Sequence, residues 1–328
     1  MTDFLANIPL LAGLDPASLA DLQRIATPFT LPPGTTLFRQ GDPADGLYLV
    51  ADGEIQVGTR APGDATMRLA PVGAGGLVGE LALLDGAPRA ATAMAETGAN
   101  GIFIPRDSFE AQVRDARPAA FALVDRVRVV VAKRIRAMVA AIAALPPEAI
   151  VAGGRMPGVS SEQAAEVASD WDAAKLLPGL APYRMMTAAQ AEALAGLGTC
   201  ITLPRGRLLA QAGSPAHYLH IVLRGALRTA IPRGESCEQL LVHGPGDLVG
   251  LLALLDEGPL ASELSVREEA VLLRIARVDF EALRTGAGEA AQALFLAANR
   301  QLVRDLRRLT RHLGRAEGLM AFNAGGVA

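Results

Sequence analysis

The chain contains few aromatic residues, only two cysteines and no long apolar run. Aromatic residues make up 4% of its 328 residues, which leaves little of the stacking surface that single-strand nucleic-acid-binding proteins use. The cysteines, Cys200 and Cys237, do not suggest a disulfide framework, and a reducing compartment suits them. No stretch approaches the roughly 18 apolar residues of a membrane span, and we expect no signal peptide. We therefore expect a cytoplasmic protein without a membrane anchor.

The net charge is small and histidine is scarce, and both observations argue against several classes of function. The formal net charge is −3, which gives no argument for attraction to nucleic acid or to a membrane surface. We find no Ser-His-Asp or Cys-His arrangement, and we expect no enzyme. We also expect no metal site, because only His217 and His220 lie close together and the other candidate ligands are far from them in the sequence. These candidates are Cys200, His217, His220, Cys237 and His243.

The most informative segment is residues 78–93, VGELALLDGAPRAATA. A glycine precedes the predicted first turn of a short helix, and the loop after this helix delivers one arginine. The amides of a helix N-terminus and a guanidinium group together suit a phosphate. A carboxylate beside a phosphate needs a role of its own, and accepting a hydrogen bond from a sugar hydroxyl is such a role. The segment therefore predicts a site for a phosphate ester of ribose.

This segment resembles the phosphate-binding cassette of the cyclic-nucleotide-binding domain family. The family includes the regulatory subunits of cAMP-dependent protein kinase, the bacterial catabolite activator protein and gated channels. The resemblance implies that Glu80 accepts a hydrogen bond from the ribose 2′-hydroxyl, that Arg89 pairs with the cyclic phosphate, and that Gly79 lets the backbone approach the sugar. It also implies that two amides, those of Ala82 and Ala90, bond to the phosphate oxygens. The expected ligand-binding residues are Gly79, Glu80, Leu81, Ala82, Arg89, Ala90 and Ala91.

The resemblance also bears on the ligand and on the empty site. Ala90 lies where cGMP-binding kinases commonly carry threonine, so cAMP is favoured over cGMP, and no metal is implied. Without ligand, Glu80 and Arg89 are expected to neutralise each other, so that binding exchanges one partner for another. Other cyclic mono- or dinucleotides remain alternatives.

Residues upstream of the cassette support the match, which covers nearly all of residues 7–145. Residues 31–42 resemble the opening strands of the family's β-roll. Gly41 and Gly53 lie where tight turns need a positive φ. Residues 47–50 and 53–57 predict a hairpin of two strands.

The chain also contains an internal repeat. The offset is 172 residues between Leu31 and Leu203 and 171 residues between Gly75 and Gly246. In the second copy, Leu251 stands at the Glu80 position and Leu260 at the Arg89 position. The scaffold persists there without the charged pair, so the fold alone does not require that pair. We predict a binding site in the first copy and a degenerate one in the second.

These patterns predict an α+β, mainly β, fold. Two jelly-roll-like β-rolls are each flanked by helices, and each is followed by a long helix, over residues 118–145 and 289–315. The expected domains are residues 1–145 and 176–316, joined by a linker over 146–175 and followed by a disordered tail over 317–328. Our hypothesis is that the two long helices pack on each other, within one chain or in a homodimer.

We therefore expect a cyclic-nucleotide sensor that signals to an unknown protein partner through the helix at residues 118–145. One alternative is a ligand-independent scaffold for protein interaction. Another is a relative of transcription regulators without a recognisable DNA-binding domain, in which arginines of the last helix contact DNA. We do not expect DNA binding of the usual kind, because only 15 residues follow Leu313.

Overall fold

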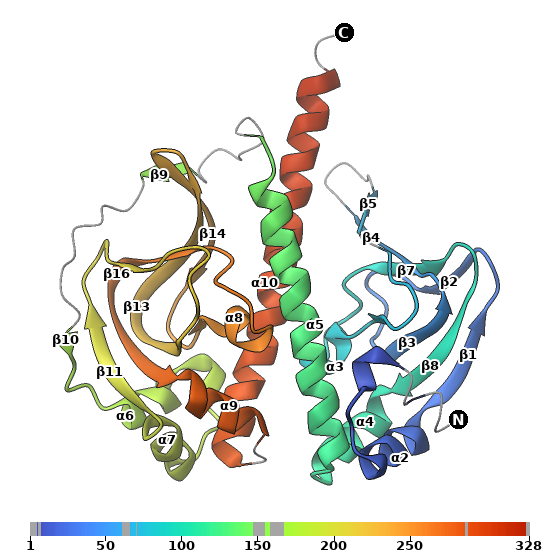
Figure 1. The fold of residues 1–328 in the computed structure, drawn as a ribbon, viewed down its shortest axis with the longest axis horizontal. Coiled ribbons are helices and arrows are strands. Elements are labelled where there is room, and N and C mark those ends of the chain that lie inside the picture. The colour runs from blue at the N-terminus through green and yellow to red at the C-terminus, as the bar shows by residue number, and fades with distance from the viewer. Residues whose placement is uncertain are drawn as a thin grey trace. The chain divides into compact units, whose positions relative to one another are not determined.

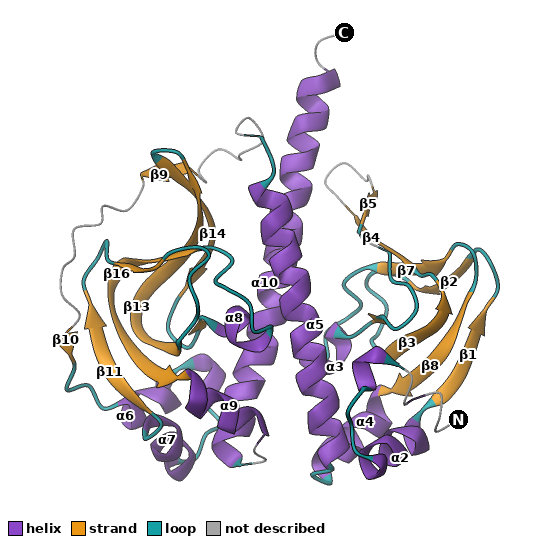
Figure 2. Cartoon of the chain, viewed as in Figure 1, coloured by secondary structure: helices purple, strands orange, loops and turns teal. Residues whose placement is uncertain are grey.

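The structure, a computed structural model, describes residues 5, 8–60, 66–69, 71–146, 155–157, 167–285 and 288–325. The chain forms two compact units, Met1–Arg128 (unit 1) and Val129–Ala328 (unit 2). Both are drawn in Figures 1 and 2. Each unit contains antiparallel strands together with helices, as the sequence predicts. Residues 129–143, which we expected in the first domain, cluster with unit 2.

Unit 1 contains two four-stranded antiparallel sheets, in the orders β1-β8-β3-β6 and β2-β7-β4-β5. The strands are β1 (Thr27–Leu31), β2 (Thr35–Phe38), β3 (Gly46–Gly53), β4 (Gln56–Arg60), β5 (Thr66–Arg68), β6 (Leu77–Val78), β7 (Thr92–Ala95) and β8 (Ala99–Pro105). The predicted hairpin over residues 47–57 is wrong, because β3 and β4 belong to different sheets. Gly53, with φ of 85°, ends β3 where the chain leaves the first sheet for the second.

The core of unit 1 lies between its two sheets. Each sheet contributes small and β-branched side chains, which suit a closely packed interface between pleated surfaces. The buried cluster consists of Val50, Ile55, Val78, Ala93, Ala95 and Ala99. Because Val78 and Ala93 stand on either side of residues 79–92, this core fixes both ends of the segment that carries the candidate site.

The helices of the N-terminal half of the chain include three that contact the sheet containing β3 and β8. The helices of this half are η1 (Pro9–Leu11), α2 (Pro16–Ile25), α3 (Leu81–Asp85), α4 (Arg106–Arg114) and α5 (Pro118–Ala143), and Figure 1 shows α2 and α4 at one end of the sheets. α2 begins at Pro16, and the amide of Ser18 donates to the carboxylate of the N-cap residue Asp15 at 2.9 Å. The hydrogen bonds from Ser18 also lower the pKa of Asp15. α5 begins in unit 1, and its later part belongs to unit 2.

Unit 2 contains one eight-stranded sheet. Its path is β10-β11-β16-β13-β14-β9, with β12 paired to β16 and β15 paired to β13. The strands are β9 (Arg155–Pro157), β10 (Val167–Ala168), β11 (Gly198–Leu203), β12 (Leu208–Ala210), β13 (Tyr218–Arg233), β14 (Ser236–His243), β15 (Leu248–Val249) and β16 (Glu263–Ala276). Two of these strands, β9 and β10, come from the segment that we expected to be a linker.

The helices of unit 2 include the long C-terminal helix that the sequence predicts. They are α6 (Ala173–Leu176), η3 (Leu177–Gly179), η4 (Ala181–Tyr183), α7 (Ala188–Ala195), α8 (Leu251–Leu255), α9 (Arg277–Thr285) and α10 (Glu289–Gly325). α10 contacts α7, η4 and β14. The expected disordered tail differs from the structure, because residues 317–325 continue α10 and contain several strong helix formers. Residues 326–328 lie outside the described residues.

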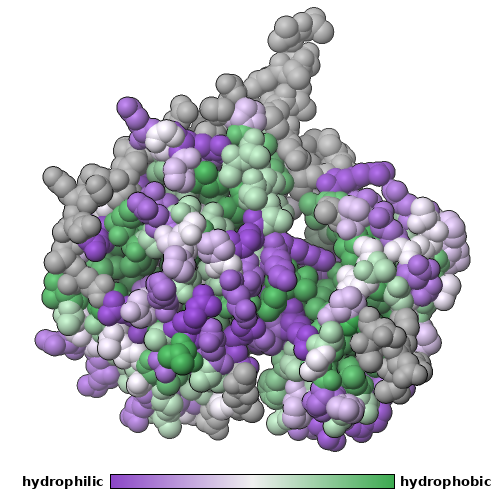
Figure 3. Space-filling model, in the orientation of Figure 1, coloured by the Kyte–Doolittle hydropathy of each residue, from purple (hydrophilic) through white to green (hydrophobic). Residues whose placement is uncertain are grey.

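The surface of unit 2 is of mixed polarity. Figure 3 shows hydrophilic and hydrophobic residues interspersed over the visible face of this unit. Among the residues that the structure describes, no helix has the length and the apolar character needed to cross a membrane. Even the long α5 carries charged side chains, among them Arg126, Lys133 and Arg134.

Candidate ligand-binding site

The candidate site begins at a glycine turn between β6 and α3. Gly79 has φ of 83°, a left-handed backbone conformation that residues other than glycine rarely adopt. A Cβ atom at this position would meet the guanidinium group of Arg89 and would lie 3.2 Å from the carbonyl oxygen of Gly46. The glycine therefore serves two purposes, because it allows the turn and leaves room for the arginine.

We expect Gly79→Ala to weaken the binding of any ligand that Arg89 holds. The strained backbone should also cost about 1–2 kcal/mol of unfolding free energy. Gly73→Ala is the matched control, because Gly73 has no positive φ and a Cβ atom there would meet nothing within 4 Å. Urea unfolding and equilibrium titration of both variants make the comparison. Equal behaviour of the two variants would contradict the assigned role of Gly79.

Glu80 places a carboxylate inside unit 1. The residue is 3% exposed and directly precedes α3, where its carbonyl oxygen accepts a hydrogen bond from the Leu83 amide at 3.0 Å. Burying an ionised carboxylate is costly unless charges or hydrogen bonds compensate for the lost hydration. A buried acid at this place is consistent with a site that accepts hydrogen bonds from a polar ligand.

Arg89 is the buried cation of the site, and its backbone is fixed on both sides. The Arg89 amide donates to the carbonyl oxygen of Asp42 at 2.9 Å, and the Gly41 amide donates to the Arg89 carbonyl oxygen at 2.9 Å. Gly41 has φ of 93°, as predicted. The residue as a whole is 4% exposed. These two bonds therefore hold the main chain of Arg89 in place against the loop of residues 41–42.

The guanidinium group of Arg89 contacts three kinds of partner. It forms an ion pair with Asp45, and its Nη1 donates to the Gly79 carbonyl oxygen at 3.2 Å. Its carbon Cζ lies 4.1 Å from the centroid of the Phe38 ring and 5.8 Å from that of Tyr48. Within the described part of the chain, its Nε has no hydrogen-bond partner. A donor with spare capacity is thus buried at the position where an anion is expected.

Sequence reasoning missed Asp45, Phe38 and Tyr48. Asp45 lies in the loop before β3, 44 residues from Arg89, and its side chain is 60% exposed. Burial, followed by the charge of Asp45, raises the pKa of Tyr48 to about 12, so this phenol stays protonated at neutral pH. The acidic, glycine-containing loop of residues 41–46 was the available signal, but the pairing with Arg89 depends on the tertiary fold.

The other expected residues are close neighbours of Glu80 or Arg89 in the sequence. Leu81 and Ala82 open α3, while Ala90 and Ala91 directly follow Arg89 and are partly buried. The structure therefore brings all seven predicted residues into one segment between β6 and β7.

Unit 2 reproduces the backbone of this site without its charges. The Gly213 amide donates to the Leu260 carbonyl oxygen at 2.8 Å, and the Leu260 amide donates to the Ser214 carbonyl oxygen at 2.8 Å. These bonds match those made by Arg89, and they support the alignment of the two copies. Gly250, with φ of 89°, matches Gly79, and the buried Leu251 follows it where Glu80 follows Gly79. Apolar side chains thus replace both charged groups.

The histidines and cysteines do not converge. Among the described residues, no three histidine, cysteine or acidic side chains form a group that could hold a metal ion. Burial, followed by the charge of Arg274, lowers the pKa of His220 to about 4. Burial also lowers the pKa of His243.

Comparison with known proteins places this sequence in a family. The family model described as "Cyclic nucleotide-binding domain" matches residues 28–116 and 200–285. The chain is 30% identical, over 136 residues, to a CRP-like cAMP-activated global transcriptional regulator from Mycobacterium tuberculosis, covering 42% of this chain and 59% of that protein. It is 36% identical, over 110 residues, to a cAMP-dependent protein kinase regulatory subunit from Aspergillus niger, covering 33% of this chain and 25% of that protein.

One solved structure that matches most of this chain is the regulatory domain of Toxoplasma gondii PKA with cAMP. It is 22% identical to this chain, with a TM-score of 0.32, and the match covers 89% of this chain and 93% of that one. Of the two curated relatives named above, the chain spans 59% of the length of the transcriptional regulator and 25% of the length of the kinase regulatory subunit.

Proposed function

The chain belongs to the cyclic nucleotide-binding domain family, with two such domains, and on that premise we propose that unit 1 binds cAMP in preference to cGMP. The observation that carries the proposal is the buried guanidinium of Arg89. Its Nη1 donates to the carbonyl oxygen of Gly79, and the buried Glu80 directly follows that glycine. The second copy of the domain supports the proposal, because it keeps the backbone and has lost both charges.

The proposed roles follow the chemistry of each group. Arg89 pairs with the cyclic phosphate, and Glu80 accepts a hydrogen bond from the ribose 2′-hydroxyl. Gly79, Leu81, Ala82, Ala90 and Ala91 supply the close backbone around the sugar and the phosphate. The preference for cAMP rests on Ala90, whose side chain has no hydroxyl to offer a guanine base.

Asp45 gives this proposal a mechanism for partner exchange. The Arg89 guanidinium is paired with Asp45, whose side chain is 60% exposed. A phosphate reaching Arg89 takes up donors of the guanidinium, and the Asp45 carboxylate can turn to water at little cost. Binding thus moves a buried cation from one anion to another, which avoids the cost of leaving a charge unpaired.

We propose that α5 carries the signal to a protein partner. Its residues 129–143 belong to unit 2, where Arg136 forms two hydrogen bonds, of 2.5 and 2.7 Å, with the Asp256 carboxylate at the end of α8. Arg233 donates to the carbonyl oxygens of Ile142, Ala143 and Leu145 at the end of the helix. Ligand binding in unit 1 would then shift the population of two α5 arrangements.

Native-state hydrogen exchange tests the proposal, because it follows peptides of unit 1 separately from those of unit 2. At one hundred times its dissociation constant, cAMP should raise the free energy of unfolding of unit 1 by about 2.7 kcal/mol. At the same concentration cGMP should raise it less.

Two alternatives predict different results in the same protein. A ligand-independent scaffold predicts that neither nucleotide changes exchange in unit 1. A DNA-binding regulator acting through the arginines of α10 predicts DNA binding that weakens steeply as the salt concentration rises. The proposed role itself is non-catalytic.

A further inference from the structure

The C-terminal end of α5 is held by a side chain from the unit 2 sheet. Arg233, the last residue of β13, donates from Nη2 to the carbonyl oxygen of Ile142 at 2.7 Å, and from Nη1 to those of Ala143 at 2.8 Å and Leu145 at 3.1 Å. The last carbonyl groups of a helix have no partner within the helix, and a cation beside them also complements the negative end of the helix dipole. One arginine therefore caps the last turn of α5.

Glu238, on β14, connects this cap to another helix. Its side chain is 2% exposed, and each of its two carboxylate oxygens has a partner of its own. Oε2 accepts hydrogen bonds from Nε and Nη2 of Arg233 at 3.2 and 2.9 Å. Oε1 lies 2.8 Å from Nε2 of His312 on α10, and this nitrogen is the donor when the carboxylate is ionised. A continuous path of polar contacts thus joins the end of α5 to α10.

The burial of this path indicates that it fixes a geometry. Replacing a buried ion pair by apolar side chains of similar volume is often neutral or stabilising, so a core strand does not need a carboxylate for its stability. A buried carboxylate does penalise every arrangement in which one of its partners moves away. The positions of Arg233 and His312 are therefore coupled through Glu238.

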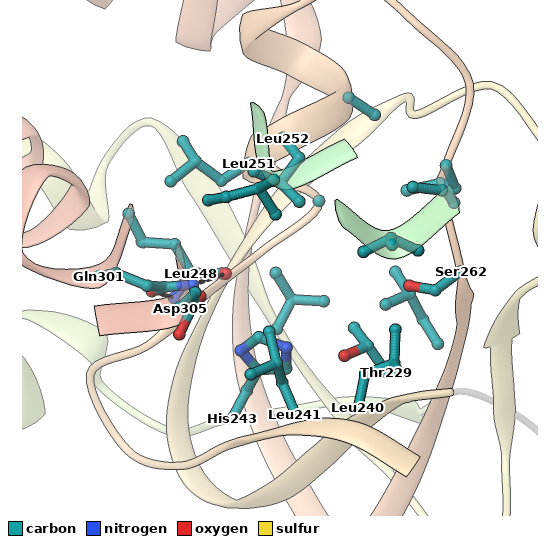
Figure 4. Close-up of a pocket in the computed structure, with 18 of the residues that line it drawn as sticks. Thr229, Leu240, Leu241, His243, Leu248, Leu251, Leu252, Ser262, Gln301 and Asp305 are labelled. Atoms are coloured by element: carbon teal, nitrogen blue, oxygen red, sulfur yellow. Dashed lines mark hydrogen bonds between the residues drawn. The ribbon is translucent and has the colours of Figure 1, made fainter. Parts of the chain in front are cut away.

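Apolar packing between the same elements is incomplete nearby. α5, β14 and α10 all contribute side chains to the wall of a cavity of about 50 Å³ in unit 2, among them Ile135 and Val139 of α5. Figure 4 shows Leu241 and His243 of β14 and Asp305 of α10 in this wall. A void has no atoms that could pass on a displacement by contact. The polar path is therefore a more direct connection between the two helices than packing across the cavity.

We propose that Arg233, Glu238 and His312 form a relay that couples the C-terminal end of α5 to α10. Arg233 is the positioning residue for α5, Glu238 orients Arg233, and His312 ties Glu238 to α10. A movement of α10 that withdraws His312 weakens the hold of Arg233 on α5, and because coupling is reciprocal, a movement of α5 reaches α10 by the same route. That α5 moves on ligand binding rests on the proposed function, whereas the relay is a property of unit 2 alone.

Amide hydrogen exchange of the full chain without nucleotide, resolved by NMR, tests the relay. The reporters are the amides of Ala144 and Leu145, which donate to carbonyl oxygens of the last turn of α5 at 3.0 and 3.1 Å. His312→Leu removes a contact between α10 and β14, and we expect both reporter amides to exchange at least about threefold faster. His312→Gln keeps an N–H donor and should restore most of the protection.

The matched control is Thr310→Val, on the same helix. Thr310 is also half-buried, and its hydroxyl donates to the Leu306 carbonyl oxygen within α10 at 2.9 Å. This variant should leave both reporter amides unchanged. Arg233→Leu should speed their exchange about tenfold, because it removes the cap itself. Once Arg233 is absent, adding His312→Leu should have little further effect, since His312 acts through Arg233.

Three results would overturn the relay. The first is an unchanged reporter exchange in His312→Leu, and the second is an equal change in His312→Leu and Thr310→Val. The third is a double variant in which the two effects multiply. Where Arg233→Leu does not fold, the three variants at His312 and Thr310 decide the question. Because no nucleotide is added, a failure of cAMP binding is not mistaken for a failure of the relay.

Discussion

Arg89→Leu is expected to weaken cAMP binding by at least about thirtyfold while leaving unit 1 folded. Removing one partner of a buried, hydrogen-bonded charge pair costs about 2–5 kcal/mol of binding free energy, and thirtyfold corresponds to the lower limit. The fold should persist because Leu260 of unit 2 occupies the same backbone position with the same pair of hydrogen bonds. Isothermal titration gives the affinity, and circular dichroism with thermal melting reports on the fold.

The control for this variant is Arg39→Leu, which removes the same charge from an exposed position near the same loop. Its affinity for cAMP should stay within a factor of about two, since an exposed charge contributes little at this distance. If Arg39→Leu and Arg89→Leu lost affinity equally, general electrostatic attraction would explain binding, and a phosphate contact at Arg89 would not be needed.

His220 is expected to lower the unfolding free energy of unit 2 by about 3 kcal/mol as the pH falls from about 6.5 to about 4. The folded state holds the pKa of His220 near 4, chiefly because the ring is buried, and the unfolded chain returns it to about 6.5. Between these values the unfolded state binds a proton that the folded state does not, so stability falls by about 1.4 kcal/mol per pH unit. Above pH 6.5 the ring is neutral in both states, and this contribution to stability is fully present.

Urea unfolding at several pH values measures this effect, with the fluorescence of Trp171 as the probe. Trp171 is the single tryptophan of the chain and lies in unit 2 beside Arg224. His220→Leu should flatten the pH dependence, whereas His217→Leu, at an exposed position, should not. His243 adds to the slope, because burial lowers its pKa as well. A pH dependence that is the same in His220→Leu and in the unaltered protein would contradict the burial of this ring.

The parts of the site that could be predicted are those whose requirements are local. Gly41 and Gly53 adopt the expected positive φ, because a tight turn imposes that conformation on a single residue. The repeat could also be recognised in the sequence, since two copies of one backbone need glycines and leucines at matching positions. The family comparison confirms the two domains on this basis.

The features that were missed depend on contacts between distant segments. Asp45 reaches Arg89 across 44 residues, and nothing in the local sequence specifies that pair. Residues 47–57 were wrongly predicted to form a hairpin, because two adjacent strand patterns look the same whether or not the strands share a sheet.

The central claim is that one domain of this chain binds a cyclic nucleotide and the other does not. Isothermal titration of the full chain with cAMP tests this most directly, because the molar ratio at the end point counts the sites. Our account predicts one cAMP per chain. Two per chain, or no binding of any cyclic nucleotide, would contradict it.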